Sequence, residues 1–417
     1  MVEMIHRAGN APLTVTLDLT RWGDAASASK MGLLRWILET HAEQIGTLII
    51  PAIDYAVIAA FAAKASSLRT LMFVLPGQTA DNIYLSEPSA APPVEFSALK
   101  SLETPYIAQH ACFYALTLKT LVLYEPPLTR NQLRLQQELL DDTDSVMDML
   151  NDDDYALDVL DGADSVMDML GAVLYHAPQL GELDIHLPSN FTEVSDDDGG
   201  VELPAARKLS IIGATSACAR FLSLVQVPQA AKVSMDCFPD VHFSSSQDLP
   251  NILYNAVMDP RKFATTSFPP LVSASIAYRP VAMWGSPETE WEIRGWRSLR
   301  PLRSVREDDE PDVLLRISYG SFPEHVYAVL ATAPFYDVRA LRFGPWQRPE
   351  HDPYKNDKRM KYAVAICKLP QLEHLTLEGC TRRMASEIAK STLAQSVLMI
   401  DCDEEGMYGS CIYYLWS

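Results

Sequence analysis

Pro178-Gln179-Leu180-Gly181-Glu182-Leu183-Asp184-Ile185 and Pro370-Gln371-Leu372-Glu373-His374-Leu375-Thr376-Leu377 are two near copies of one phrase, Pro-Gln-Leu-x-x-Leu-x-(Leu/Ile). Their separation of nearly half the chain indicates internal repetition. The core of the phrase, an apolar Leu-x-Leu triplet, recurs along the sequence. The further copies are Leu17-Asp18-Leu19, Leu48-Ile49-Ile50, Leu71-Met72-Phe73, Leu121-Val122-Leu123, Leu209-Ser210-Ile211, Val233-Ser234-Met235, Leu315-Arg316-Ile317, Leu341-Arg342-Phe343 and Leu398-Met399-Ile400.

The spacing of the triplets favours a repeat architecture. Several neighbouring copies stand 23 to 26 residues apart, within the roughly 20–29 residues of a leucine-rich repeat, although other gaps are longer and irregular. Helix-like segments precede strand motifs at Met31 to His41, Tyr55 to Ala65, Val166 to His176, Pro323 to Thr332 and Met384 to Leu393. We therefore expect an α/β fold over residues 1–417: an irregular leucine-rich-repeat solenoid with a curved parallel sheet on its concave face and helices on its convex face. An ordinary α/β domain is the alternative, since its buried strands are also short and leucine-rich.

Charge is concentrated in a few segments. The formal net charge is −20, and Glu138 to Asp168 contains twelve acidic residues and no Lys or Arg, while Glu193 to Glu202 adds five more. We interpret about 137–169 as an acidic insertion and about 193–202 as an acidic loop. An Asp-Ser-Val-Met-Asp-Met-Leu phrase occurs at both 144–150 and 164–170, which indicates a tandem duplication within the insertion. The rest of the chain is nearly balanced in charge, so nucleic acid and anionic membrane are not expected partners.

The cysteines and apolar runs indicate an intracellular protein, cytoplasmic or nuclear. The seven cysteines are scattered and form no Cys-x-x-Cys pair, as expected of reduced, buried thiols. No secretory signal is evident at the start of the sequence, and the most apolar run, Tyr55 to Ala63, is too short to span a membrane.

A third segment, about 281–311, is rich in arginine and tryptophan. Arg294, Arg297, Arg300, Arg303 and Arg306 recur at every third position. Trp291 and Trp296 lie among them, and an acidic run follows at 307–310. Such a cluster can anchor an acidic partner, but pairing of the arginines with the nearby acidic residues is the favoured interpretation.

The opening His6-Arg7-Ala8-Gly9-Asn10-Ala11-Pro12-Leu13-Thr14-Val15-Thr16-Leu17 resembles the Arg-Ser-Gly-x-Ala-Pro-Leu-x-(Val/Ile)-x-Leu phrase of the basidiomycete fungal F-box and leucine-rich-repeat family. The Pro-Gln-Leu-x-x-Leu-x-Leu copies also look like that family. Only the repeat region is expected to be covered, because the few residues before this phrase do not suffice for an F-box. The resemblance implies the substrate-recognition half of a ubiquitin-ligase adaptor, with a ubiquitin-ligase substrate as partner.

No motif in the sequence carries recognisable catalytic or metal-binding chemistry. The histidines have no metal-ligand spacing, and no P-loop, dinucleotide-binding or hydrolase-elbow motif occurs. We therefore expect no enzymatic activity, no cofactor, no metal and an unidentified protein as partner. An enzyme on a non-solenoid α/β fold and a truncated paralogue without a partner are the alternatives. The candidate partner-binding residues flank or split the apolar pairs and carry polar or aromatic heads: Tyr124, His186, Asp236, Arg316, Arg342, His374 and Glu378.

Overall fold

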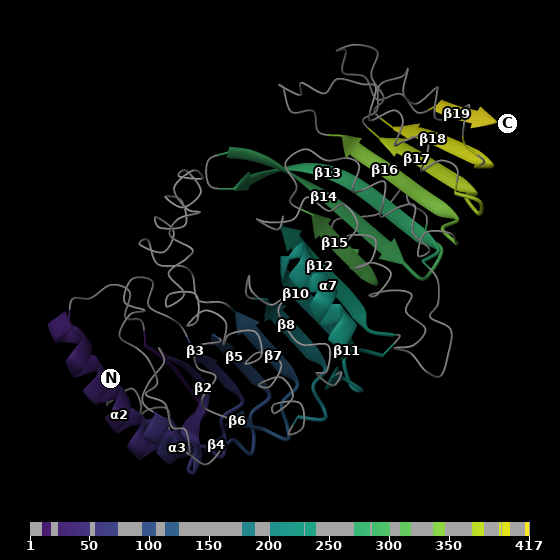
Figure 1. Ribbon diagram of the computed structural model, residues 1–417. Coiled ribbons are helices and arrows are strands. Elements are labelled where there is room, and N and C mark those ends of the chain that lie inside the picture. The colour runs from purple at the N-terminus through teal and green to yellow at the C-terminus, as the bar shows by residue number, and fades with distance from the viewer. Residues whose placement is uncertain are drawn as a thin grey trace, which may run out of the picture. The chain divides into compact units, whose positions relative to one another are not determined.

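The structure is a computed structural model of the whole chain. It describes residues 11–17, 24–50, 55–73, 94–105, 113–124, 177–187, 201–228, 230–238, 271–283, 286–300, 309–317, 337–346, 369–378, 392, 394–400 and 413–416. The chain divides into two compact units, unit 1 from Met1 to Ala206 and unit 2 from Arg207 to Ser417. Each unit is rich in strands and poor in helices among its described residues (Figure 1).

Unit 1 contains a parallel sheet in the order β1-β2-β3-β5-β7-β8. These strands are β1 Leu13–Thr16, β2 Ile45–Ile50, β3 Thr70–Phe73, β5 Ser101–Pro105, β7 Thr120–Tyr124 and β8 Glu182–His186. The helices are α2 Asp24–His41, the short 3-10 helix Ala42–Gln44, and α3 Tyr55–Ala62. Three two-residue strands complete the unit: β4 Val94–Glu95, β6 Phe113–Tyr114 and β9 Val201–Glu202.

A column of leucines runs across the unit 1 sheet in register. The pairs are Leu48 with Leu71, Leu71 with Leu102, Leu102 with Leu121, and Leu121 with Leu183. All five side chains are at most 2% exposed. Burying a leucine stabilises a fold by about 1.5–3 kcal/mol, so this column is a main source of the unit's stability. We call the side of each sheet that carries these apolar rows the inner face and the opposite side the outer face.

The same turn precedes strand after strand. A backbone N–H donates to the carbonyl three residues earlier in the pairs Leu68–Ala65, Leu118–Ala115, Leu180–Ala177, Ala206–Leu203, Ala231–Pro228 and Leu372–Leu369. The next residue along the chain then donates a backbone hydrogen bond to the residue just before the neighbouring strand. Gly181 N–H donates to the Lys119 carbonyl, and Glu373 N–H donates to the Arg339 carbonyl. The Pro-Gln-Leu phrase is thus a turn whose leucine is buried in the core. The turn and the strand that follows it are the unit that repeats along the chain.

Unit 2 has a mixed sheet in the order β10-β12-β15-β14-β13-β16-β17-β18-β19. Its strands are β10 Lys208–Ala214, β12 Lys232–Phe238, β13 Ser273–Met283, β14 Ser286–Trp296, β15 Val313–Ile317, β16 Ala340–Trp346, β17 His374–Glu378, β18 Ser396–Ile400 and β19 Tyr413–Trp416. The helix α7 Thr215–Leu224 contacts β10 and β12, and β11 Val225–Gln226 follows it.

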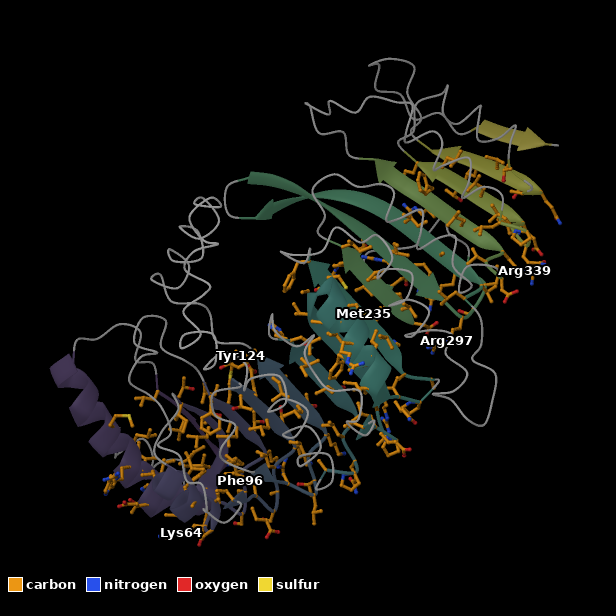
Figure 2. All side chains as sticks on the ribbon, viewed as in Figure 1. Lys64, Phe96, Tyr124, Met235, Arg297 and Arg339 are labelled. Carbon is orange, nitrogen blue, oxygen red and sulfur yellow. The ribbon has the colours of Figure 1, made fainter. Side chains whose placement is uncertain are left out.

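The inner face of unit 2 is an apolar row across the mixed sheet. Met235 pairs with Leu315, and Phe343 pairs with Leu377 three strands further along the sheet. Between them, Ile293 of β14 and Ile276 of β13 pair in the hairpin that these two strands form. The four residues Met235, Leu315, Ile276 and Ile293 are at most 2% exposed, and Cys237 is buried with them. Met235 lies close to α7 in Figure 2, consistent with a helix covering this face.

The β13–β14 hairpin corrects the expectation of an all-parallel sheet. β14 runs antiparallel to β15, and β13 runs parallel to β16, so the two long strands extend the sheet between β15 and β16. β19 is also antiparallel to its neighbour β18. Part of the segment expected to be an arginine-rich insertion is therefore a strand of the sheet. From Trp291 to Arg294, apolar and charged residues alternate, as in a strand with two different faces.

The first strand ends at Thr16, and of the expected triplet at 17–19 only Leu17 lies within the described residues. One other sequence expectation was wrong in detail. In β18 Val397 pairs with the inner residue Leu375, so Leu398, which pairs with Thr376, lies on the outer face. Four consecutive apolar residues at 397–400 do not fix which face each one takes. Thr376 lies on the outer face of β17 and is nevertheless only 6% exposed.

The remaining triplets lie in strands as expected, and α2 and α3 cover the first two predicted helices. The helix α7 had no expected counterpart. The predicted helices at 166–176 and 323–332 lie outside the described residues, as do the acidic insertion at 137–169 and, apart from β9, the acidic loop. The predicted helix at 384–393 has only residue 392 described, which is not in a helix.

Candidate functional site

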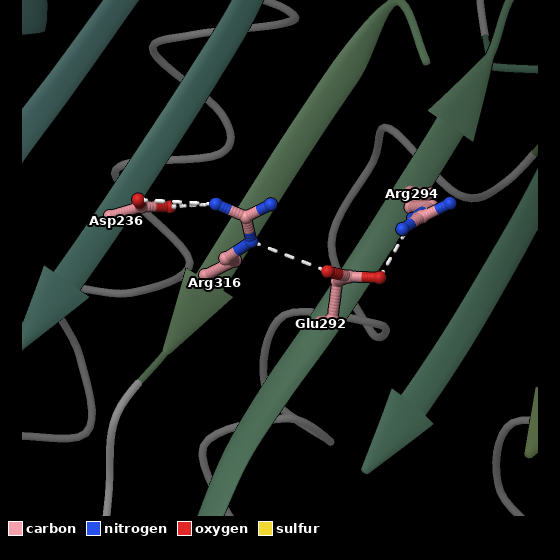
Figure 3. Close-up of polar contacts among 4 residues, drawn as sticks. All are labelled: Asp236, Glu292, Arg294 and Arg316. Carbon is pink, nitrogen blue, oxygen red and sulfur yellow. Dashed lines mark hydrogen bonds and ion pairs between the residues drawn. The ribbon is translucent and has the colours of Figure 1, made fainter. Parts of the chain in front are cut away.

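The outer face of unit 2 carries a line of four charged side chains, which we call the Arg316 cluster: Asp236, Arg316, Glu292 and Arg294 (Figure 3). The Arg316 Nη1 donates to both carboxylate oxygens of Asp236 at 3.3 Å. Its Nε donates to Oε2 of Glu292 at 3.3 Å, and the Arg294 Nε donates to the other oxygen of Glu292 at 2.7 Å. Three neighbouring strands are thereby joined by side chains as well as by the backbone.

Strand register explains this alignment. Asp236 on β12 pairs directly with Arg316 on β15, and Arg316 pairs with Glu292 on β14. Arg294 is two residues beyond Glu292 and so lies on the same face. Opposite charges at directly opposed positions stabilise a sheet, so the register and the charges reinforce each other.

Glu292 is the buried centre of the cluster. Its side chain is 3% exposed, whereas those of Arg316 and Asp236 are 38% and 36% exposed. A buried carboxylate is tolerated when it is paired and hydrogen-bonded, and here two guanidinium groups satisfy its two oxygens. Glu292 therefore fixes the position of Arg316, which stays accessible to solvent at the outer face.

A second pair lies on β16 and β17. Arg342 Nη2 and Nε both donate to Oε2 of Glu378, at 2.5 and 2.9 Å, and the two side chains are 16% and 18% exposed. The close approach of these strands depends on Gly344, whose φ is +118°. A side-chain carbon at Gly344 would lie 2.1 Å from the Glu378 carbonyl oxygen.

The other candidates are more isolated. His374 is exposed, and its Nδ1 lies 2.8 Å from the Ser396 hydroxyl on β18. In unit 1, the Tyr124 hydroxyl donates to the Phe73 carbonyl. His186 lies at the end of β8, near enough to Glu103 to influence its pKa. The structure thus brings four of the seven candidates together as two ion pairs, Asp236 with Arg316 and Arg342 with Glu378, and leaves the other three apart.

The described part of the arginine-rich segment pairs within the chain, as favoured from the sequence. Arg297 lies 4.0 Å from Asp312 and donates to the Ala231 carbonyl at 3.0 Å, while burial lowers its pKa and Asp312 opposes that shift. Arg300 lies 3.7 Å from Asp309 and stacks over the fully buried Trp296 at 5.7 Å from the ring centre. These contacts hold the residues just after β14 against the segments that precede β12 and β15. Positions 303 and 306 lie outside the described residues.

The outer face of unit 1 also holds two carboxylates, Glu103 on β5 and Asp184 on β8. Val122 of β7 pairs with both and lies between them. Burial raises the pKa of Glu103, the charge of Asp184 raises it further, and His186 lowers it. One carboxylate oxygen of Asp184, Oδ1, is buried and has no hydrogen-bond partner among the described residues. Neither carboxylate forms an ion pair with a lysine or arginine in the part of the chain that the structure describes.

Sequence reasoning missed Glu103 and Asp184, and it considered Glu292 only as an ion-pair partner of the nearby arginines. Asp184 is the central residue of its own Leu-x-Leu triplet, so the rule that chose Arg316 and Arg342 also applied to it. The strand of Glu103 has only one leucine, Leu102, but Leu99 three residues earlier supplies the Leu-x-x-Leu introduction seen elsewhere. For Glu292 no sequence pattern indicated burial.

Comparison of the chain with known protein families finds no match, and no curated protein matches it. Among the described helices, none is long and apolar enough to cross a membrane. Within the same described ranges, no three His, Cys, Asp or Glu side chains gather as a metal site would require.

Proposed function

We propose that this chain is a non-enzymatic protein-recognition scaffold whose binding surface is the outer face of its strands. The repeated turn and strand units support a solenoid of the leucine-rich-repeat kind, in which one sheet face builds the core and the other is available to a partner. The resemblance of the opening phrase extends the proposal to the substrate-recognition part of a ubiquitin-ligase adaptor.

The observation that carries the proposal is the Arg316 cluster. Binding hot spots are enriched in arginine, and much of the entropic cost of recruiting a long side chain is avoided if that side chain is already held in place. Glu292 and Asp236 hold the Arg316 guanidinium from two neighbouring strands, and 38% of the side chain remains exposed. A side chain fixed and yet accessible is suited to contacting an oriented acceptor on another protein.

Two outer-face positions near the cluster carry small side chains. Ser210 of β10 pairs with Ser234 of β12, and both are half-buried. Small side chains beside a fixed arginine leave room for a partner's side chains to approach the sheet. This offers a way to block the face without touching the ion pairs.

The test uses tagged full-length protein as bait with cell extract. The double variant Ser210→Tyr/Ser234→Tyr places two bulky rings on the outer face, and Ala60→Tyr/Lys64→Tyr places the same rings on the exposed surface at α3. We expect a stoichiometric partner of the parent protein to be lost by about tenfold or more from the first variant and retained by the second. Equal retention by both variants, with unchanged unfolding curves, would contradict the proposal.

A further inference from the structure

The outer face of unit 1 differs in charge from that of unit 2. In unit 2 the carboxylates Asp236, Glu292 and Glu378 each contact a guanidinium. In unit 1 the carboxylates Glu103 and Asp184 have no described lysine or arginine as an ion-pair partner. Unit 1 therefore presents negative charge that its own described side chains do not neutralise.

The surroundings of the two carboxylates are apolar. The register places Ile49, Met72, Glu103, Val122 and Asp184 in one row across β2, β3, β5, β7 and β8. All five are half-buried. Neighbouring strands are about 4.8 Å apart, so the two carboxylate-bearing backbones are about 10 Å apart with Val122 in the middle.

Leaving these groups as they are has an energetic cost. Desolvation and the mutual repulsion of Glu103 and Asp184 both raise the pKa of Glu103. A buried acceptor without a hydrogen bond, as at Asp184 Oδ1, costs about 1–3 kcal/mol. An arriving cation with several N–H donors would offset the repulsion between the two carboxylates and offer them charge-assisted hydrogen bonds.

We propose that this face of unit 1 binds an extended, cationic segment of a partner protein, with an arginine or lysine side chain lying over Val122 between Glu103 and Asp184. This inference rests on the proposed function and specifies the chemistry of the partner. The methylene stem of an arginine or lysine covers apolar surface while its charged head reaches a carboxylate. Met72 and Ile49 continue the row, and they offer an apolar surface to the partner residues next to that cation. His186, the other titratable group near Glu103, lies at the end of β8.

A second outer-face row, two residues earlier in each strand, supports binding of an extended segment. Thr47, Thr70, Ser101 and Thr120 pair in succession across β2, β3, β5 and β7, and all four are half-buried. Short hydroxyl side chains keep this part of the face low and offer both donors and acceptors. A peptide crossing the strands can therefore approach the sheet closely along this row.

The experiment selects short random peptides displayed on phage against the full-length protein and measures the affinities of the selected peptides by fluorescence anisotropy. We expect selected peptides to carry arginine or lysine beside apolar residues, and their affinity to fall as salt is raised. The near-isosteric variant Glu103→Gln/Asp184→Asn should weaken binding about tenfold or more. The matched control, Glu39→Gln/Glu43→Gln, removes two exposed carboxylates of the same unit from α2 and the adjoining 3-10 helix, and should leave the affinity within about twofold.

A second variant separates recognition from folding. Val122→Lys supplies an internal ammonium between the two carboxylates, so it should abolish peptide binding while raising the melting temperature. A merely structural role for this row predicts the opposite change in stability. Selected peptides without arginine or lysine, no selection at all, or equal losses in the two carboxylate doubles would overturn this inference. Peptides that are lost only from Ser210→Tyr/Ser234→Tyr would also overturn it, yet would leave the proposed function standing.

Discussion

Arg342 on β16 and Glu378 on β17 form a two-point contact, with the Nη2 and Nε of the guanidinium at 2.5 and 2.9 Å from one carboxylate oxygen. Neither residue faces its partner directly, since Arg342 is in register with Thr376. The contact is a diagonal one between adjacent strands. Because both side chains are less than 20% exposed, solvent screens this pair less than an ordinary surface ion pair.

Truncating either partner should therefore destabilise unit 2. We expect Glu378→Gln and Arg342→Met each to lower the free energy of unfolding by about 1–3 kcal/mol, with a coupling energy of about 1–2 kcal/mol in the double-mutant cycle. Denaturant unfolding measures all four proteins. Additive losses, or single losses within about 0.5 kcal/mol, would show that the pair contributes no more than a solvated one.

The inner and outer residues of β17 should respond differently to truncation. Leu375 and Leu377 are at most 1% exposed, so Leu375→Ala or Leu377→Ala should cost about 2–5 kcal/mol through lost burial and a cavity. His374 is exposed, and His374→Ala should stay within about 0.5 kcal/mol. Equal losses at inner and outer positions would contradict the assignment of the two faces.

Glycine is required at 344 but not at 32. Gly344→Ala would force a side chain into a positive φ and onto the Glu378 carbonyl, so we expect a loss of about 2 kcal/mol or more. Gly32 lies within α2 with open space around it, and Gly32→Ala should stabilise the protein by about 0.5–1 kcal/mol. Thermal unfolding of the two variants should shift in opposite directions, and a tolerated Gly344→Ala would count against the close approach of β16 and β17.

The raised pKa of Glu103 makes a prediction about pH. The folded state holds its proton more tightly than the unfolded state, whose pKa is about 4.3, so stability falls as pH rises through the window from that value to the raised folded pKa. Glu103→Gln removes this loss, and its melting temperature should gain on that of the parent as pH is raised from about 4 to 7. The gain should shrink in an Asp184→Asn background, since Asp184 is one cause of the shift. A gain that is flat or reversed with pH would refute the electrostatic account of this face.

The apolar pattern of a single strand predicted the features that depend on that strand alone. In β10 the alternation of Leu209, Ser210 and Ile211 indicated both the strand and its buried face, because a period of two leaves one solution when one face is apolar. In β18 the alternation is absent and the predicted face was wrong. The β13–β14 hairpin could not be predicted from the triplet, since β13 carries Ala274 where its neighbour β16 carries Leu341.

The candidate residues show the same division. Splitting an apolar pair placed Asp236, Arg316 and Arg342 on the outer face, as the strand geometry requires. Their pairing depends on which strands become neighbours, and Glu292 reaches Arg316 only because the hairpin enters the sheet beside β15. Thr376 is also buried on the outer face because of a neighbouring strand, since its partner in register is Leu398 of β18. Neighbouring strands that are far apart in sequence set these contacts, and a single strand does not encode them.

The most direct test of recognition through the outer face is site-specific photo-crosslinking with the captured partner. Benzoylphenylalanine is introduced singly at Thr70, Thr120 or Ser234 on the outer face. The control positions are Ala60 and Lys64 on the exposed surface at α3, and Figure 2 labels Lys64. The account predicts partner crosslinks from one or more of the three outer-face positions and background yield from the two control positions. Crosslinks that form from Ala60 or Lys64, with none from Thr70, Thr120 or Ser234, would contradict it.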